Sequence, residues 1–127
     1  MKYLICRIGK TNLAFQIENV EGVLEEVKIV PVPKAPEYVE GITNVRNQIV
    51  SVISLAKLLK KDLKTGQKWI LIVEDNNRFI CEIDEVGDLI NVEETTPVKG
   101  KPGIIVSTIE RGGEIYSVID PRKITRG

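Results

Sequence analysis

Histidine is absent from this chain of 127 residues, cysteine occurs twice, and aromatic residues make up 5% of the total. Zinc sites are built mainly from histidine and clustered cysteine ligands, so the composition indicates no metal site. The commonest general base is missing as well, and there is no glycine-rich phosphate loop. We therefore expect a protein without catalytic activity, metal or cofactor.

Carboxylates are the remaining candidates for catalysis. Asp84, Glu85 and Asp88 lie close together in the sequence, and so do Glu25 and Glu26. Charged residues in turns are usually solvated, so we interpret both clusters as solvated turns rather than as catalytic carboxylate pairs.

An excess of one charge is also missing, because 18 basic residues balance 18 acidic ones. A neutral chain lacks the field that attracts a polyanion, and few aromatic side chains are available to stack on bases. We therefore expect no nucleic-acid partner. A modest basic run keeps an oligonucleotide- or peptide-binding small β-barrel open as the alternative function; it consists of Lys57, Lys60, Lys61 and Lys64.

Long hydrophobic runs are absent: none approaches the roughly 18 residues that span a bilayer. The apolar core near the N-terminus is too short for a signal peptide. We therefore expect a cytoplasmic protein without direct membrane insertion. Cys6 and Cys81 form no C-x-x-C motif, so two buried thiols are the favoured interpretation and a disulfide is the alternative.

Valine and isoleucine supply much of the apolar content, and their branched side chains favour strands. Residues 20–27 fit a helical turn that leads into a strand with a bulge at Gly22, or one face of a helix. Pro31, Pro33 and Pro36 predict a rigid loop rather than a polyproline ligand, and 55–61 suit one or two helical turns. Strands are predicted at 3–8, 13–17, 49–55, 69–73, 79–83, 104–109 and 115–119, and residues 86–92 are rich in apolar side chains.

The chain repeats itself at an offset of 66 residues. Residues 3–6 match 69–72, and residues 49–53 match 115–119. Such self-similarity indicates two copies, about 1–61 and 67–127, of one structural unit. A unit of this size buries a small core, and a curled sheet hides its edges. We therefore predict an all-β fold of two linked small β-barrels with a shared apolar seam and short helical turns.

The two copies differ at one hairpin. Residues 44–47 read Asn-Val-Arg-Asn, whereas their counterparts at 110–113 read Glu-Arg-Gly-Gly, a plain turn by composition. A fold needs only a turn at this place, so Arg46 is a candidate binding residue. The alternative is an ordinary surface salt bridge, which contributes at most about 1 kcal/mol.

Residues 33–55 read Pro-x-x-Pro-x-Tyr-Val-x-Gly-Ile-x-Asn-Val-Arg-Asn-x-Ile-Val-x-Val-Ile-x-Leu. This pattern resembles the signature of the CheW family of chemotaxis coupling proteins. The resemblance implies a single CheW-like domain over 1–127, built as two five-stranded, SH3-like barrels around a shared hydrophobic interface. It also implies a non-catalytic adaptor for signal transduction in bacterial chemoreceptor arrays.

The same resemblance implies the partners. The adaptor would couple the cytoplasmic tip of methyl-accepting chemoreceptors to the regulatory domain of the histidine kinase CheA. The family's arginine and the glycine five residues before it map onto Arg46 and Gly41. The receptor-binding residues expected from the resemblance and the unshared hairpin are Arg46, Asn44, Val45, Asn47, Gly41 and Val20. The kinase contact would use an exposed strand face of the first barrel, without assigned residues.

The resemblance has departures at three positions. Asn47 stands where the family has a glycine, and asparagine tolerates a positive φ better than most residues, so the turn can survive. Ser54 replaces an aspartate that the second half keeps as Asp120. Gly22 replaces a residue that is commonly acidic.

Overall fold

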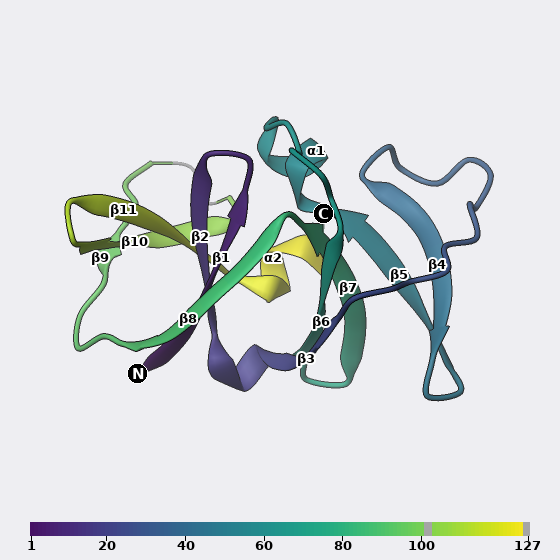
Figure 1. Cartoon of the computed structure of the whole chain (residues 1–127), viewed down its shortest axis with the longest axis horizontal. Helices are drawn as coiled ribbons and strands as arrows, with labels where there is room; N and C mark the ends of the chain where they lie inside the picture. Colours follow the sequence, from purple (N-terminus) through teal and green to yellow (C-terminus); the bar gives the residue numbers. More distant parts are fainter. Residues whose placement is uncertain (101–102, 126–127) are drawn as a thin grey trace.

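The computed structural model describes residues 1–100 and 103–125, which form strands, one 3₁₀ turn and two short helices (Figure 1). The all-β class is confirmed. In chain order the elements are β1 (Lys2–Ile8), β2 (Thr11–Gln16), η1 (Ile17–Asn19), β3 (Val20–Leu24), β4 (Val39–Val45), β5 (Gln48–Ser54), α1 (Leu55–Leu59), β6 (Lys68–Glu74), β7 (Asn77–Ile83), β8 (Glu85–Asn91), β9 (Thr96–Pro97), β10 (Ile105–Arg111), β11 (Glu114–Ile119) and α2 (Pro121–Thr125).

The strands form two curled sheets that lie side by side along the long axis (Figure 1). The six-stranded sheet has the order β8-β1-β2-β11-β10-β9, and the five-stranded sheet has the order β3-β6-β7-β5-β4. Neither strand order closes into a ring within the described residues, so the two sheets are open where we predicted barrels. At one edge the physical reason is plain: β9 has two residues, and one of them, Pro97, has no backbone donor.

Strands of the two repeats are exchanged between the sheets. β1 and β2 pair with β8 and β11, whereas β6 and β7 pair with β3 and β5. The registers agree at the repeat offset, because Leu4 lies opposite Leu89 and Ile70 lies opposite Val23. Each sheet therefore contains strands from both repeats, whereas we expected one repeat in each sub-barrel. A unit of about 60 residues buries little surface alone, and the exchange ties the two copies into one core.

The shared apolar seam is present as the largest core cluster, which draws side chains from both sheets. Phe15 and Ile8 come from the six-stranded sheet, and Ile72 comes from the five-stranded sheet. Cys6 and Cys81 are free thiols in this cluster, as predicted. Burial raises the pKa of Cys6 to about 12, so this thiol is inert.

Equivalent polar side chains start the two short helices: Ser54, the last residue of β5, and Asp120, the residue after β11. Ser54 Oγ accepts the N–H of Lys57 at 3.2 Å at the start of α1. Asp120 Oδ1 accepts the N–H of Arg122 at 3.0 Å at the start of α2. Serine and aspartate are both good N-caps, so the replacement of the family's aspartate by Ser54 keeps the capping function.

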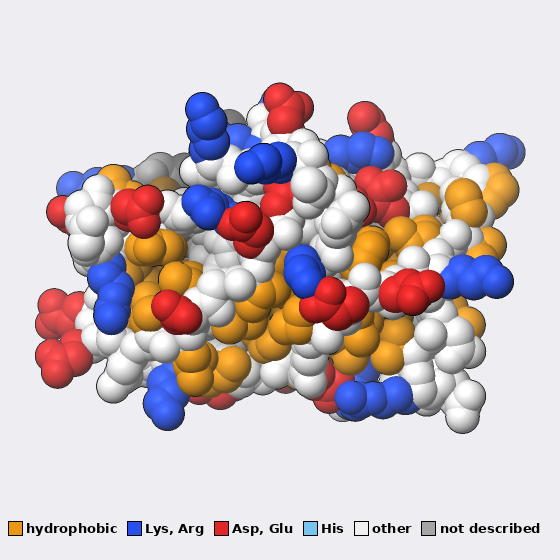
Figure 2. Space-filling model, in the orientation of Figure 1, with side chains coloured by type: hydrophobic (Ala, Val, Ile, Leu, Met, Phe, Trp, Pro, Cys, Tyr) orange, Lys and Arg blue, Asp and Glu red, His pale blue; other side chains and the backbone are white. Residues whose placement is uncertain are grey.

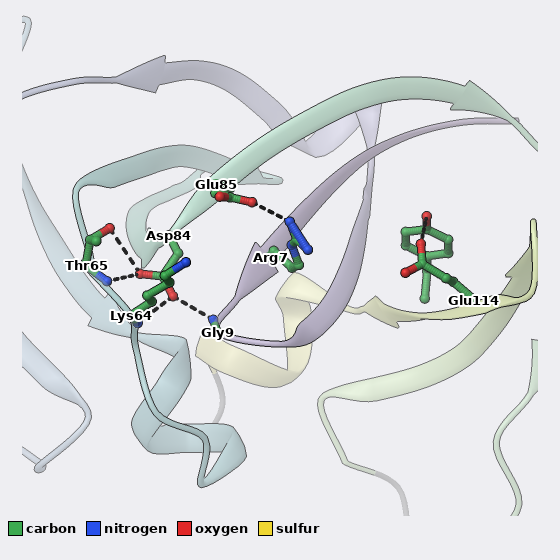
Figure 3. Close-up of polar contacts among 8 residues, drawn as sticks. Arg7, Gly9, Lys64, Thr65, Asp84, Glu85 and Glu114 are labelled. Carbon is green, nitrogen blue, oxygen red and sulfur yellow. Dashed lines mark hydrogen bonds and ion pairs between the residues drawn. The ribbon is translucent and has the colours of Figure 1, made fainter.

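Asp84 anchors the segment that connects the repeats. Its side chain is buried, at 6% exposure, where we predicted a solvated turn. Burial raises the pKa of this carboxyl, but four backbone hydrogen bonds outweigh burial and lower the pKa to about 2. The four donors, at 2.6–2.8 Å, are the backbone N–H groups of Gly9, Lys64 and Thr65 (Figure 3) and of Gly66.

The other acidic residues of these clusters are solvated, as predicted, although Glu85 and Asp88 lie in β8 rather than in a turn. Glu85 pairs with Arg7 at 2.7 Å, and Glu25 pairs with Lys68 at 2.5 Å. Both carboxylates are more than half exposed, so each pair contributes at most about 1 kcal/mol. Since Asp84 is held by backbone groups and Glu85 by Arg7, these neighbours do not form a catalytic carboxylate pair.

Candidate functional site

The hairpin between β4 and β5 presents Arg46. Val45 lies opposite Gln48, so the loop has two residues, Arg46 with φ 52° and Asn47 with φ 66°. Positive φ at both loop positions is the requirement of the type I′ hairpin turn. The side-chain oxygen of Asn44 accepts the N–H of Asn47 at 3.0 Å and braces the turn. Asn47 thus keeps the conformation that the family's glycine would adopt.

The counterpart of this turn in the second repeat is made of glycine. Gly112 has φ 60° and Gly113 has φ 79°. Glycine adopts this conformation without strain, whereas a residue with a Cβ pays roughly 1–2 kcal/mol. The fold is therefore served better by glycine, whereas Arg46 holds a strained backbone position.

Arg46 stands at the rim of a shallow groove of about 170 Å³ on the five-stranded sheet. Its apolar floor includes Val50 and Leu71, which are buried. Val45 is also apolar, and the other lining side chains are charged or polar. We call this site the Arg46 groove; it is lined by Glu21, Val45, Arg46, Gln48, Val50, Leu71 and Arg78.

An internal ion pair forms one side of the Arg46 groove. Arg78 donates two hydrogen bonds to the Glu21 carboxylate, from Nε at 2.7 Å and from Nη2 at 3.1 Å. The hydrogen bond from Arg78 lowers the pKa of Glu21, and the nearby charge of Arg46 adds to this effect. No carboxylate of the described residues lies within ion-pair distance of Arg46 itself. The groove therefore offers one uncommitted cation above an apolar floor.

Four of the six residues predicted for receptor binding lie together at the hairpin: Asn44, Val45, Arg46 and Asn47. The other two lie elsewhere. Val20 packs against the core that the sheets share. Gly41 is buried with φ +154°, and a Cβ there would lie 2.3 Å from the carbonyl oxygen of Val30. Gly41 thus permits the close approach of the segment before β4.

Five residues of the groove were not among the predicted site residues: Glu21, Gln48, Val50, Leu71 and Arg78. Glu21 lies at a β-bulge, where the pairing of β3 with β6 shifts between Val20 and Gly22. A bulge re-aims a side chain, and it turns Glu21 toward Arg78. The predicted bulge at Gly22 was the one available signal, because Glu21 and Arg78 are too far apart in sequence for any local pattern to pair them.

Exposed hydrophobic side chains are themselves duplicated. Figure 2 shows a band of hydrophobic side chains across the middle of one face, between charged side chains. Contiguous exposed apolar surface commonly marks a docking site. Three pairs of exposed residues are related by the repeat offset: Val23 and Leu89, Val32 and Val98, and Ile49 and Ile115.

Residues 2–81 match the family model described as the CheW-like domain. This chain belongs to the CheW-like domain family. The chemotaxis protein CheW of Thermotoga maritima is 46% identical over 52 residues, which make up 41% of this chain and 34% of that protein. The chemotaxis protein CheW of Treponema pallidum is 28% identical over 134 residues, or 93% of this chain and 78% of that protein.

The fold also matches a solved structure of the family. The crystal structure of the scaffolding protein TtCheW from Thermoanaerobacter tengcongensis has a TM-score of 0.86, with 20% identity, over 94% of this chain and 88% of that one. At this identity the likeness shows the fold. Neither α1 nor α2 approaches the length of a membrane-spanning helix, and the described residues contain no longer one.

Proposed function

We propose that this chain is a non-catalytic cytoplasmic adaptor that couples methyl-accepting chemoreceptors to the histidine kinase CheA. The CheW-like family, the relatives named chemotaxis protein CheW and the fold of a CheW scaffolding protein support this role. The observation that carries the site is Arg46: a strained, exposed arginine without an ionic partner among the described residues, beside an apolar groove.

The receptor tip is the partner that we assign to the Arg46 groove. An arginine beside an apolar floor favours a partner that offers a carboxylate flanked by aliphatic side chains. Asn44, Val45 and Asn47 shape the hairpin that carries the arginine, and Val20 and Gly41 support the sheet behind it. The last two act through the fold rather than by direct contact.

The test is titration of the protein against a receptor-tip fragment and, separately, against a CheA regulatory domain. Arg46→Gly removes the charge but keeps the turn, because Gly112 occupies the same place in the other hairpin. We expect this variant to bind the receptor tip about tenfold or more weakly, since one charge contact contributes about 1–3 kcal/mol. Kinase binding should be unchanged.

Lys34→Gly is the matched control. Lys34 is also an exposed cation at positive φ, 64°, but it lies outside the Arg46 groove. This variant should bind both partners as the wild type does. Failure of the wild-type protein to bind either partner would contradict the adaptor function, whereas equal receptor binding by wild type and Arg46→Gly would contradict only the assignment of Arg46.

The alternative of an oligonucleotide-binding module is not favoured. Its basic run is partly committed, because Lys57 pairs with Glu40 at 3.3 Å. The family and the relatives named chemotaxis protein CheW also favour chemotaxis coupling over nucleic-acid binding.

A further inference from the structure

The Arg46 groove has a counterpart in the six-stranded sheet. A second hollow, of about 200 Å³, opens beside the β10–β11 hairpin. We call it the Glu114 groove; it is lined by Ile5, Cys6, Arg7, Asn12, Glu85, Val86, Gly87, Glu114 and Tyr116. Five of these positions match lining positions of the Arg46 groove at the offset of 66: Ile5 and Leu71, Asn12 and Arg78, Gly87 and Glu21, Glu114 and Gln48, Tyr116 and Val50.

The β-bulge is duplicated along with the groove. The pairing of β1 with β8 shifts between Leu4 and Cys6, at the place where β6 and β3 shift in the other sheet. Gly87 occupies the position of Glu21, and a Cβ there would lie 3.0 Å from the Ile5 side chain. Ile5 therefore lies over Gly87, where the Arg46 groove has an acidic side chain.

The charges of the Glu114 groove are reversed. Arg7 and Glu85 form an internal ion pair at 2.7 Å, as Arg78 and Glu21 do in the first groove. Beyond that pair, the lining charge is Glu114 here and Arg46 there. In Figure 3, Arg7 reaches toward Glu85, and Glu114 lies on a separate strand.

Glu114 has no cation within ion-pair distance among the described residues, although Arg111 is its cross-strand neighbour. Its carboxylate accepts the Tyr116 hydroxyl at 3.1 Å. Burial raises the pKa of Tyr116, and the hydrogen bond to Glu114 raises it further, so the hydroxyl stays protonated. The phenol ring replaces Val50 of the other groove and widens the contact surface.

We propose that the Glu114 groove docks a second protein partner, by a lysine or arginine side chain flanked by aliphatic side chains. Such a cation would pair with Glu114, and its neighbours would pack on Ile5 and the Tyr116 ring. The Arg46 groove repels this partner and selects an acidic one, so each groove rejects the other's ligand. The two hairpin turns lie in different sheets at opposite sides of the molecule, which leaves room for both partners at once (Figure 1).

This inference rests on the proposed function, because an adaptor needs two separate docking surfaces. The probes are therefore a receptor-tip fragment and a CheA regulatory domain, each titrated against four forms of the whole chain. These are the wild type, Arg46→Gly, Glu114→Lys and the matched control Glu110→Lys. Glu110 lies exposed on the same hairpin but outside the groove. Because both variants replace a glutamate by lysine, they have the same net charge.

We expect Glu114→Lys to weaken the binding of one of the two probes at least tenfold. That probe should be the one that Arg46→Gly still binds as the wild type does. Glu110→Lys should bind both probes as the wild type does. The proposal is overturned if Glu114→Lys affects neither probe, or the same probe as Arg46→Gly, or if Glu110→Lys has an equal effect.

Glu114→Gln is the conservative second variant, because Gln48 occupies this position in the other groove. It should weaken the same probe by a smaller factor, with an unchanged thermal unfolding midpoint. Full binding by a folded Glu114→Gln variant, together with loss in Glu114→Lys, would indicate a steric effect and overturn the role of the charge. If the wild type binds neither probe, the proposed function itself fails, which is a separate outcome.

Discussion

The hairpin turns β4–β5 and β10–β11 occupy equivalent places in the two sheets, but one carries Arg46 and Asn47 and the other carries Gly112 and Gly113. Backbone conformation is the same in kind, with positive φ at all four residues. The difference lies in the side chains. Duplication supplies a built-in reference for what the fold needs, so a strained residue in one copy is a candidate for a functional role.

Asp84 offers the largest effect, because its anchor exists in one copy only. Its counterpart at the repeat offset, Glu18, is exposed on η1. Asp84→Ala leaves four backbone donors without their acceptor and should lower the free energy of unfolding by about 4 kcal/mol. Glu18→Ala should change it by less than about 0.5 kcal/mol. Urea unfolding measures both; similar losses would contradict the special role of Asp84.

Gly41 and Ser107 are the next pair at the repeat offset, both buried and both at a register shift. Gly41→Ala would place a Cβ 2.3 Å from the Val30 carbonyl oxygen. We expect a loss of about 3 kcal/mol in unfolding free energy. Ser107→Ala should lose about 1 kcal/mol or less, since a Cβ already fits there. Thermal or urea denaturation decides, and a well-tolerated alanine at 41 would refute the close-approach account.

The pH dependence of stability sharpens the contrast around Asp84. Its pKa is lowered to about 2 in the fold, so the unfolded chain binds the proton more tightly. The stabilisation is complete above the ordinary pKa near 4 and is lost as pH falls toward 2. The lowering of the Asp84 pKa from its ordinary value near 4 to about 2 corresponds to about 2 kcal/mol of stability. Urea midpoints measured between pH 5 and 2 should show this loss in the wild type, and an equally steep loss in Asp84→Asn would speak against it.

The turns themselves give the smallest effect. Asn47→Gly should stabilise the fold by about 0.5 kcal/mol, because glycine adopts positive φ freely and keeps the N–H that Asn44 accepts. The reciprocal change, Gly113→Asn, should destabilise by a similar amount. Differential scanning calorimetry resolves both shifts, and destabilisation by Asn47→Gly would be inconsistent with a turn of this type.

Much of the fold was predictable from local patterns. Alternating valine and isoleucine predicted most of the strands, although β4 was not among them, and the offset of 66 predicted two copies with a common seam. The bulge near Gly22 was also predicted, and it appears as the register shift of β3. The helical turn was expected within 20–27 but lies earlier, at Ile17–Asn19. These features depend on residues close in sequence or on a comparison of the chain with itself.

The site was only half predictable. The hairpin around Arg46 stood out because the other repeat has a plain turn there. Glu21 and Arg78 did not stand out, since no local sequence pattern connects a bulge on β3 with a residue on β7. Asp84 was taken for a solvated residue, because its four donors come from two distant segments.

The sequence by itself determined most of the strands, the duplication, the positive-φ turn and the candidate Arg46. Tertiary structure decided the exchange of strands between the sheets, the burial of Asp84 and the two grooves of opposite charge. The physical reason is range: side-chain periodicity and turn chemistry act between neighbours. Strand pairing within each sheet brings together residues far apart in the sequence, such as Arg78 and Glu21, whose contact no local pattern encodes. In the same way it places Tyr116 and Ile5 in the lining of one groove.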